Sequence, residues 1–179
     1  TSSARGQDQI TLIEGWTFGQ LRAALDAHPA LKHETSGATE VELIARLQIP
    51  PPSAEGWFLP DTYYFPRGAS DAALLLRAHR AMQTQLAALW QARADGLPLA
   101  NAYEALILAS IIEKETGQPA ERAMIAAVFV NRLKIGMKLQ TDPTVIYGLG
   151  RAFDGHLRKR DLLEDGPYNT YTRGGLPPT

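Results

Sequence analysis

The stretch ILASIIEKETG, residues 107–117, predicts a buried helix with an acidic last turn. Asn101 marks the expected start of this helix, because its side chain can accept a hydrogen bond from a free N–H of the first turn. Gly117 marks the expected end. Apolar residues surround most of the helix, so it should be buried on several sides. We therefore expect the larger part of the chain to be built around it.

The last turn of this helix contains two glutamates, and either could be a proton donor. A carboxylate there meets the negative end of the helix dipole, and apolar neighbours would remove its water; both effects favour the neutral acid, which can donate a proton. Glu113 and Glu115 point roughly 200° apart, so only one can face a given cleft. Glu115 continues the stripe of Leu108 and Ile111, whereas Glu113 lies beside Ser110. Periodicity leaves the choice open, and a solvated helix end is the ordinary alternative.

Helical patterns flank this segment on both sides. A long helix is expected from Ser70, a good N-cap residue. Another begins at Pro119, which suits a first helical turn, and ends at Gly136; it should form a hairpin with the central helix. A brief helix is expected over 144–147, within a region of short elements and turns, where sites are usually built.

The amino-terminal part predicts a strand over 9–13 and two short helices. Each helix has a capping box, Thr17 to Gln20 and Thr39 to Glu42, and three prolines follow the second. This order resembles the LysM-type sugar-binding module; a small structural α+β appendage is the alternative. With a further strand over 62–65, the expected fold class is α+β: a LysM-like module and proline linker at residues 1–54, then a mostly helical catalytic domain at residues 55–179.

Composition excludes several functions. The chain has 179 residues, 45% of them hydrophobic and 21% charged, with a formal net charge of −1, so no electrostatic bias toward nucleic acid is present. Without cysteine there is no thiol catalysis, Cys-ligated zinc or disulfide. The four histidines, His28, His33, His79 and His156, lack the i, i+4 spacing of a helical zinc site. No metal or cofactor is expected.

No run of about 18 apolar residues occurs in the sequence, and Thr1–Gly6 has neither the basic nor the apolar region of a signal peptide. As given, the chain is expected neither to span a membrane nor to carry a signal.

Four separated motifs occur in the larger part of the chain: ASIIEKET at 109–116, FVNRL at 129–133, LQTDPTVIYG at 139–148 and YNTY at 168–171. Together and in this order they closely resemble the YceG-like family of endolytic murein transglycosylases. The similarity extends from Glu55 to Pro178, and more loosely to the amino-terminal part. The family pattern continues beyond both ends, so the resemblance implies a soluble portion, truncated at its carboxy-terminal end, of a protein anchored by an amino-terminal helix in the bacterial inner membrane, on its periplasmic face.

The resemblance also implies an activity. It is cleavage of the β-1,4 bond between N-acetylmuramic acid and N-acetylglucosamine in peptidoglycan glycan strands, without water, leaving a 1,6-anhydro ring. Peptidoglycan synthases are the implied partners. Glu113 would be the acid and base, with Glu115 second, orienting the site. The implied substrate-binding residues are Gln140, Thr141, Asp142, Tyr147, Tyr168, Asn169, Thr170 and Tyr171.

These side chains suit a sugar, since amides and hydroxyls bind its polar groups and aromatic faces its C–H surfaces. Gln140 and Asn169 are the strongest candidates for contact with substrate, because neither has an evident role in forming a turn. Asp142, before Pro143, could instead cap a helix, and buried tyrosines often only satisfy a hydroxyl. Glu55 and Asp61 are expected to be structural or to support the site.

Two rival functions stay open at this point. A true glycoside hydrolase would pair Glu113 as acid with Asp142 or Asp61 as base, the carboxyl groups being roughly 6.5–9.5 Å apart. A non-catalytic glycan-binding scaffold would bind without turnover, independently of Glu113.

Overall fold

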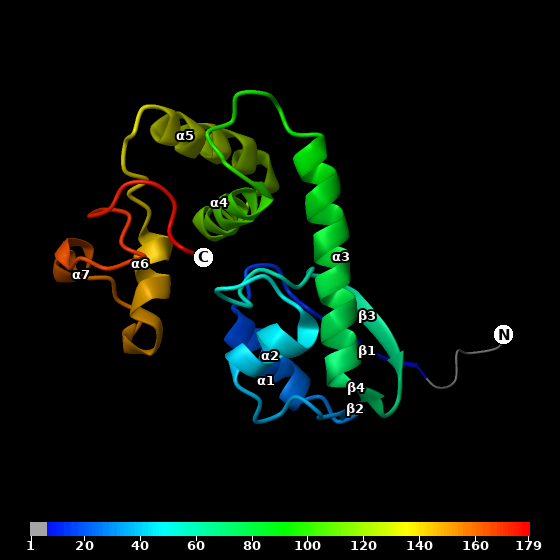
Figure 1. Ribbon diagram of the computed structural model, residues 1–179. Coiled ribbons are helices and arrows are strands. Elements are labelled where there is room, and N and C mark those ends of the chain that lie inside the picture. The colour runs from blue at the N-terminus through cyan, green and yellow to red at the C-terminus, as the bar shows by residue number, and fades with distance from the viewer. Residues whose placement is uncertain (1–6) are drawn as a thin grey trace. The chain divides into compact units, whose positions relative to one another are not determined.

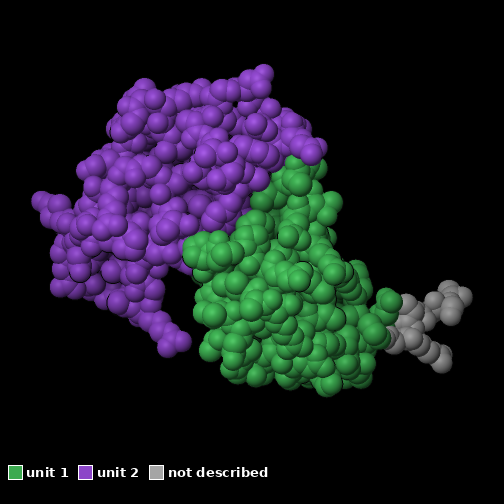
Figure 2. Space-filling view, viewed as in Figure 1, with its two compact units in different colours: residues 1–88 green, residues 89–179 purple. Residues whose placement is uncertain are grey.

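The computed structural model describes residues 7–179. The chain divides into two compact units, residues 1–88 and residues 89–179 (Figure 2). The expected α+β class is confirmed, because helices dominate and a few short strands accompany them (Figure 1). Residues 1–6, the start of the expected LysM-like module, lie outside the described part of the chain.

The first unit holds four short strands and three helices among its described residues. They are β1 (Gln7–Thr11), α1 (Phe18–Asp26), β2 (Leu31–Lys32), α2 (Glu40–Leu47), β3 (Thr62–Pro66), β4 (Ala69–Ser70) and α3 (Asp71–Gln91), whose last residues enter the second unit. β1 pairs antiparallel with β3, Ile10 lying opposite Tyr63, and β2 pairs parallel with β4. The buried faces of these elements form the core of this unit, with Leu25, Leu43 and Leu75 almost fully enclosed.

The pairing of β1 with β3 joins residues on either side of the proline linker. Tyr63 and Phe65 are buried while Tyr64 between them is exposed, as expected for a strand with one face on a core. The first compact unit therefore includes residues on both sides of the proline linker and extends to residue 88.

The predicted helix starts are largely confirmed. Thr17 and Thr39 each form a complete capping box, with Gln20 and Glu42 as the returning side chains. Asn101 accepts a hydrogen bond from the backbone N–H of Glu104.

Two predicted helix boundaries are formed by other means than predicted. Ser70 does not cap α3, because it lies in β4 and its hydroxyl donates to Glu34. Gly117 does not end the central helix by a left-handed turn. The helix stops at Thr116, whose backbone is extended and whose hydroxyl donates to Glu121 at 2.6 Å.

The second unit is helical in its described elements: α4 (Ala102–Glu115), the 3-10 turn η1 (Pro119–Glu121), α5 (Arg122–Lys134), α6 (Asp142–Leu149), the 3-10 turn η2 (Gly150–Ala152) and α7 (Lys159–Leu163). Its core consists of Ile107, Leu108 and Ile111 of α4 with Phe129 of α5 and Leu139. Gly136 ends α5 in the left-handed conformation, as predicted. The helix α7 was not predicted, because its five residues carry no apolar period that could be recognised.

Within the described part of the chain, no helix combines the length and the apolar character that crossing a membrane requires.

Candidate active site

The last turn of α4 holds the two glutamates in different surroundings. Glu113 faces the start of α5, and Glu115 faces the segment that leads into α6. The expectation that only one of them can enter a given site therefore agrees with the geometry, since each has its own partners.

Glu113 forms an ion pair with Arg122, the first residue of α5, at 3.0 Å between Oε2 and Nη2. About 30% of the Glu113 side chain and 43% of the Arg122 side chain are exposed. The sequence suggested apolar walls around this carboxylate, and the structure places a guanidinium there. An ion pair so exposed stabilises the fold by only about 0–1 kcal/mol.

Glu115 is anchored by Thr141, whose hydroxyl donates to Glu115 Oε1. Thr141 belongs to a cluster of three buried threonines, Thr141, Thr144 and Thr170, which we call the threonine cluster. Thr144 donates to the Thr141 carbonyl at 2.8 Å and shares a hydrogen bond with the Thr170 hydroxyl at 2.9 Å. The cluster thus ties the end of α4, the start of α6 and the carboxy-terminal loop together.

Asp142 and Tyr171 form a second link across the same region. The Tyr171 hydroxyl donates to Asp142 Oδ1 at 2.5 Å. Burial raises the pKa of Tyr171 to about 12, and the hydrogen bond to Asp142 and the charges of Asp142 and Glu115 add to the effect. Tyr171 is therefore a hydrogen-bond donor throughout the neutral range. Asp142 is the first residue of α6 and Thr141 its N-cap, so Asp142 is not the cap that the sequence suggested.

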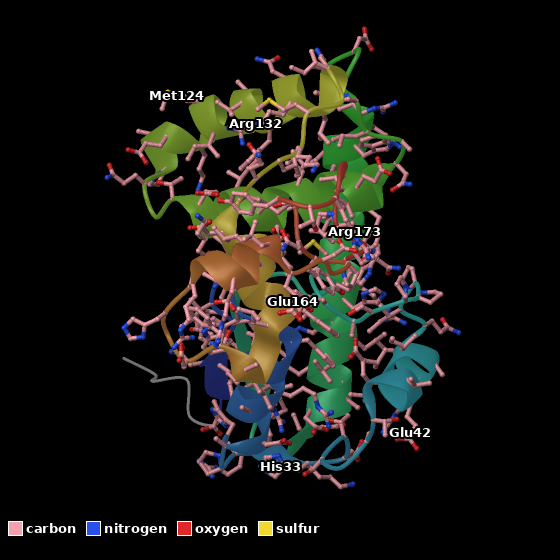
Figure 3. The ribbon with its side chains drawn as sticks, turned by 90° about the vertical axis from the view of Figure 1, so that its left-hand side faces the viewer. His33, Glu42, Met124, Arg132, Glu164 and Arg173 are labelled. Carbon is pink, nitrogen blue, oxygen red and sulfur yellow. The ribbon has the colours of Figure 1, made fainter. Side chains whose placement is uncertain are left out.

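Gln140 is exposed between two buried neighbours and has a left-handed backbone, with φ of 53°. Its N–H donates to the Thr170 carbonyl at 3.1 Å. Arg132 of α5, which is labelled in Figure 3, donates to the carbonyl of Leu139, the residue before Gln140. The side chain of Gln140 is thus presented to solvent from a backbone that is fixed on both sides.

Asn169 has a structural duty, contrary to the expectation. It is buried, and its Nδ2 donates to the carbonyls of Asp161, Leu162 and Glu164, at 3.2, 3.1 and 2.7 Å. Its Oδ1 accepts from the N–H groups of Tyr171 and Thr172. Asn169 therefore joins α7 to the loop that follows, and its side-chain atoms are occupied within the protein.

Tyr147 and Tyr168 contact each other edge to face, with ring centroids 5.0 Å apart, and Tyr147 is 37% exposed. Gly148 makes this approach possible, because a Cβ there would lie 3.0 Å from the Cβ of Tyr168. The pair offers partly open aromatic surface beside α6.

The structure therefore gathers Glu115, Gln140, Thr141, Asp142, Thr170 and Tyr171 directly, through hydrogen bonds. Sequence reasoning missed Arg122, Arg132 and Thr144. Thr144 could have been found from its spacing of three residues from Thr141 in the first turn of a helix. Arg122 and Arg132 make contacts that no local period reveals. Glu55 accepts from the N–H of Phe18 at 2.6 Å in the first unit, which is a structural role.

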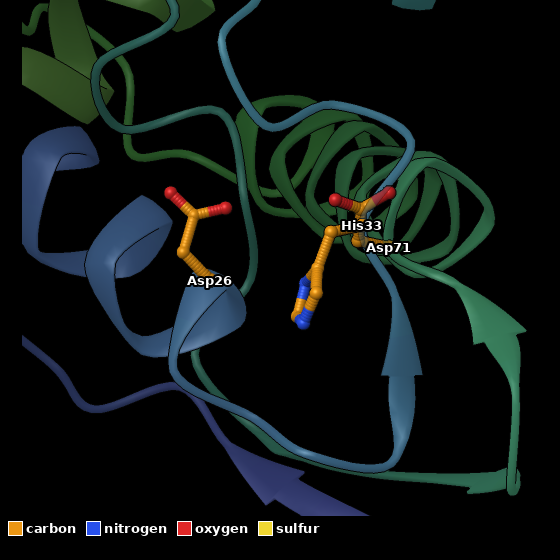
Figure 4. A group of neighbouring side chains, drawn as sticks. All are labelled: Asp26, His33 and Asp71. Carbon is orange, nitrogen blue, oxygen red and sulfur yellow. The ribbon is translucent and has the colours of Figure 1, made fainter.

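One group of possible metal ligands occurs among residues 7–179: Asp26 at the end of α1, His33 after β2 and Asp71 at the start of α3, with ligand atoms within 4.8 Å of one another (Figure 4). Asp71 is fully buried and accepts hydrogen bonds from the N–H groups of Glu34, Thr35 and Ala72 and from the Thr35 hydroxyl. Its lone pairs are thereby used, and only Asp26 and His33 remain as available ligands.

A cavity of about 440 Å³ lies at the opposite end of α4 from Glu113. Asn101, Tyr103 and Glu104 line it together with Leu133 and the segment 175–178. None of the predicted site residues contributes to this cavity, so it is not the candidate active site.

A family model described as the YceG-like family matches residues 1–179. An endolytic murein transglycosylase of Bacillus subtilis (strain 168) is 32% identical over 195 aligned residues, which cover 99% of this chain and 54% of that protein. A protein of the same name from Streptococcus pneumoniae serotype 2 is 30% identical, over 69% of this chain and 23% of its own length. The chain thus spans about half of the Bacillus protein.

A crystal structure of the yceG-like protein lmo1499 from Listeria monocytogenes resembles this chain with a TM-score of 0.71 and 30% identity, covering 95% of this chain and 61% of that one. The fold of this chain is thus shared with a yceG-like protein. The chain belongs to the YceG-like family.

Proposed function

We propose that this chain is the catalytic part of an endolytic murein transglycosylase. It would cleave the β-1,4 bond between N-acetylmuramic acid and N-acetylglucosamine within peptidoglycan strands, without water. Membership of the YceG-like family and the names of the two relatives support this function. The observation that carries it is Glu113, a partly exposed carboxylate in the last turn of a core helix, within a motif that resembles the family.

In the proposed mechanism Glu113 is the acid and then the base. It first gives its proton to the bridging oxygen, and the bond from C1 to that oxygen breaks. The C6 hydroxyl of the same muramyl residue then attacks C1 and returns a proton to Glu113. Because the attacking hydroxyl belongs to the same sugar, the second step is intramolecular and needs no carboxylate nucleophile.

The second carboxylate would have a different role. Glu115 already accepts the Thr141 hydroxyl, and Asp142 already accepts the Tyr171 hydroxyl. We assign these groups to holding the segment 139–142 against the end of α4, so that polar side chains of that segment meet the glycan.

The proposal includes the expected setting of the complete protein. A LysM-like module in the first unit, which would bind glycan, is part of this proposal, and the order of β1, α1 and α2 supports it. Anchoring at the periplasmic face of the inner membrane and association with peptidoglycan synthases follow from the family resemblance alone.

Substitution of each glutamate tests the assignment. On uncrosslinked glycan strands, Glu113→Gln should give no anhydromuramyl product, while Glu115→Gln, which keeps an acceptor for Thr141, should give product at a reduced rate. Mass spectrometry identifies the product, since an anhydro end is one water lighter than a hydrolysed end. Circular dichroism should show both variants folded.

Other outcomes have defined meanings. Product from Glu113→Gln but not from Glu115→Gln would assign the acid to Glu115. Hydrolysed ends from the unsubstituted protein would establish the hydrolase. Binding of glycan without any turnover would establish the scaffold.

A further inference from the structure

Two residues other than glycine have a left-handed backbone within residues 7–179: Gln48, with φ of 55°, and Gln140, with φ of 53°. This conformation is unfavourable for a residue with a Cβ and costs glycine nothing. Gln48 is the C-cap of α2, where a left-handed residue is the ordinary way to end a helix. Gln140 follows no helix end directly, so its conformation needs another cause.

The surroundings of Gln140 impose this conformation. Arg132 binds the carbonyl of the preceding residue, and Thr170 binds the N–H groups of both Gln140 and Thr141, at 3.1 and 3.0 Å. Leu139 and Thr141 on either side are 0% and 1% exposed. Between these anchors the Gln140 side chain is exposed. An unfavourable backbone that is fixed so completely is typical of a residue whose side chain must point in one direction.

The location of Gln140 connects it with the proposed reaction. The next residue, Thr141, donates to Glu115, which lies two positions after Glu113 on α4. The hydrogen bonds that fix the segment around Gln140 therefore also connect it to the end of α4, the helix that carries the proposed acid.

We propose that Gln140 is a specificity-determining residue that recognises the N-acetyl group of an amino sugar. This inference rests on the proposed function, which makes an N-acetylated glycan the substrate. The side-chain amide offers one acceptor and two donor hydrogens, and an acetamido group offers one N–H and one carbonyl. The two groups can form a pair of parallel hydrogen bonds. A fixed backbone lowers the entropy lost when this pair forms.

The experiment compares N-acetylated glycan strands with the same strands after chemical de-N-acetylation. The unsubstituted protein should prefer the N-acetylated strands. Gln140→Gly should lower kcat/KM on these strands about 10-fold, the effect of about two lost hydrogen bonds, and should barely change it on the de-N-acetylated strands. Gln140→Glu should reverse the preference, because a carboxylate accepts from the ammonium group of the de-N-acetylated sugar.

Gln48 provides a matched control, since it has the same side chain, the same backbone conformation and an exposed position. Gln48→Gly and Gln140→Gly should each raise the Tm of the unit that carries them, by about 2–4 °C, because glycine relieves the same strain. Only Gln140→Gly should lose activity. A Gln140→Gly protein that gains stability and keeps its full preference for N-acetylated strands would overturn the inference.

Binding measurements separate this inference from the proposed function. Titration calorimetry with chitotetraose and with its de-N-acetylated counterpart needs no turnover. Suppose that the protein forms no anhydro product but binds chitotetraose more tightly than its de-N-acetylated counterpart, and that Gln140→Glu reverses this preference. The proposed function then fails and the inference stands. If the protein forms product and its preference is unchanged in both Gln140 variants, the function stands and the inference fails.

Discussion

At the scale of single residues, the side chains with the most hydrogen bonds in the candidate site hold its loops. Asn169 uses both its amide nitrogen and its amide oxygen on backbone groups of α7 and of residues 171 and 172. Thr141 and Thr170 hold the segment before α6. The Thr141 hydroxyl donates to Glu115, and Thr170 accepts from the N–H groups of Gln140 and Thr141. Gln140 and Tyr147 are more exposed, and they are the better candidates for contact with a substrate.

Asn169→Asp is expected to destabilise the second unit by about 2–4 kcal/mol, although the two side chains have the same shape. The substitution removes the donors and sets a carboxylate against three carbonyl oxygens. Urea unfolding measures the loss. Asn131→Asp, the same change at an exposed position of α5, is the control and should cost less than about 1 kcal/mol. Equal losses in the two variants would contradict the structural duty of Asn169.

Tyr171 gives a prediction about alkaline pH. Its pKa is raised from 10.0 to about 12, so the folded protein holds this proton more tightly than the unfolded chain does. The resulting stabilisation is complete below pH 10 and is lost as the pH rises toward about 12. The difference in unfolding free energy between the unsubstituted protein and Tyr171→Phe should therefore shrink over this range. A difference that does not vary with pH would refute the role of the Tyr171 hydroxyl.

At the scale of elements, α6 packs so closely on the carboxy-terminal loop that one position favours glycine. A Cβ at Gly148 would lie 3.0 Å from the Cβ of Tyr168. Gly148 is not in a left-handed conformation, so its role is space and not backbone freedom. The contact between Tyr147 and Tyr168 depends on this space.

Gly148→Ala should consequently fail to stabilise the protein, although alanine has the higher helix propensity by about 1 kcal/mol. The added methyl group would push Tyr168 away from Tyr147. Thermal unfolding, together with the ring-proton chemical shifts of the two tyrosines, measures both effects. Gly19→Ala in α1 is the control, because a Cβ there has its nearest neighbour at 3.8 Å. Gly19→Ala should be stabilising by about 0.5 kcal/mol. A similar gain in Gly148→Ala, with unchanged shifts, would show that the close approach is unimportant.

At the scale of the whole molecule, the chain forms two compact units, and the first contains both β1 and β3, which pair with each other. The buried side chains of β3, Tyr63 and Phe65, belong to a core that also contains Ile10 and Leu12. A domain that began at residue 55 would contain β3 without its partner strand.

We therefore expect a fragment of residues 89–179 to fold. In a fragment of residues 55–179, we expect only residues 89–179 to fold. In the longer fragment, amide hydrogens of residues 62–66 should exchange rapidly, because β3 has lost β1 and its apolar face is open to water. Hydrogen exchange followed by NMR measures this. Slow exchange of those amides would mean that residues 55–179 form a self-sufficient domain.

The sequence by itself determined the local features of this protein. The capping boxes at Thr17 and Thr39, the cap at Asn101 and the turn at Gly136 are all as predicted, because each depends on residues three or four positions apart. The apolar residues Ile107, Leu108 and Ile111 also predicted correctly that α4 contributes to the core of its unit. The expectation that this helix is buried on several sides is wrong, because Ala109 and Ser110 are exposed.

The tertiary structure alone decided the partners of the two glutamates. Arg122 for Glu113 and Thr141 for Glu115 come from different later segments, and the duty of Asn169 depends on the path of the chain around α7. The physical reason is that one helix period places Glu113 and Glu115 on different faces without saying what will pack against either face. That depends on contacts between residues far apart in the chain, and these exist only once the unit has folded.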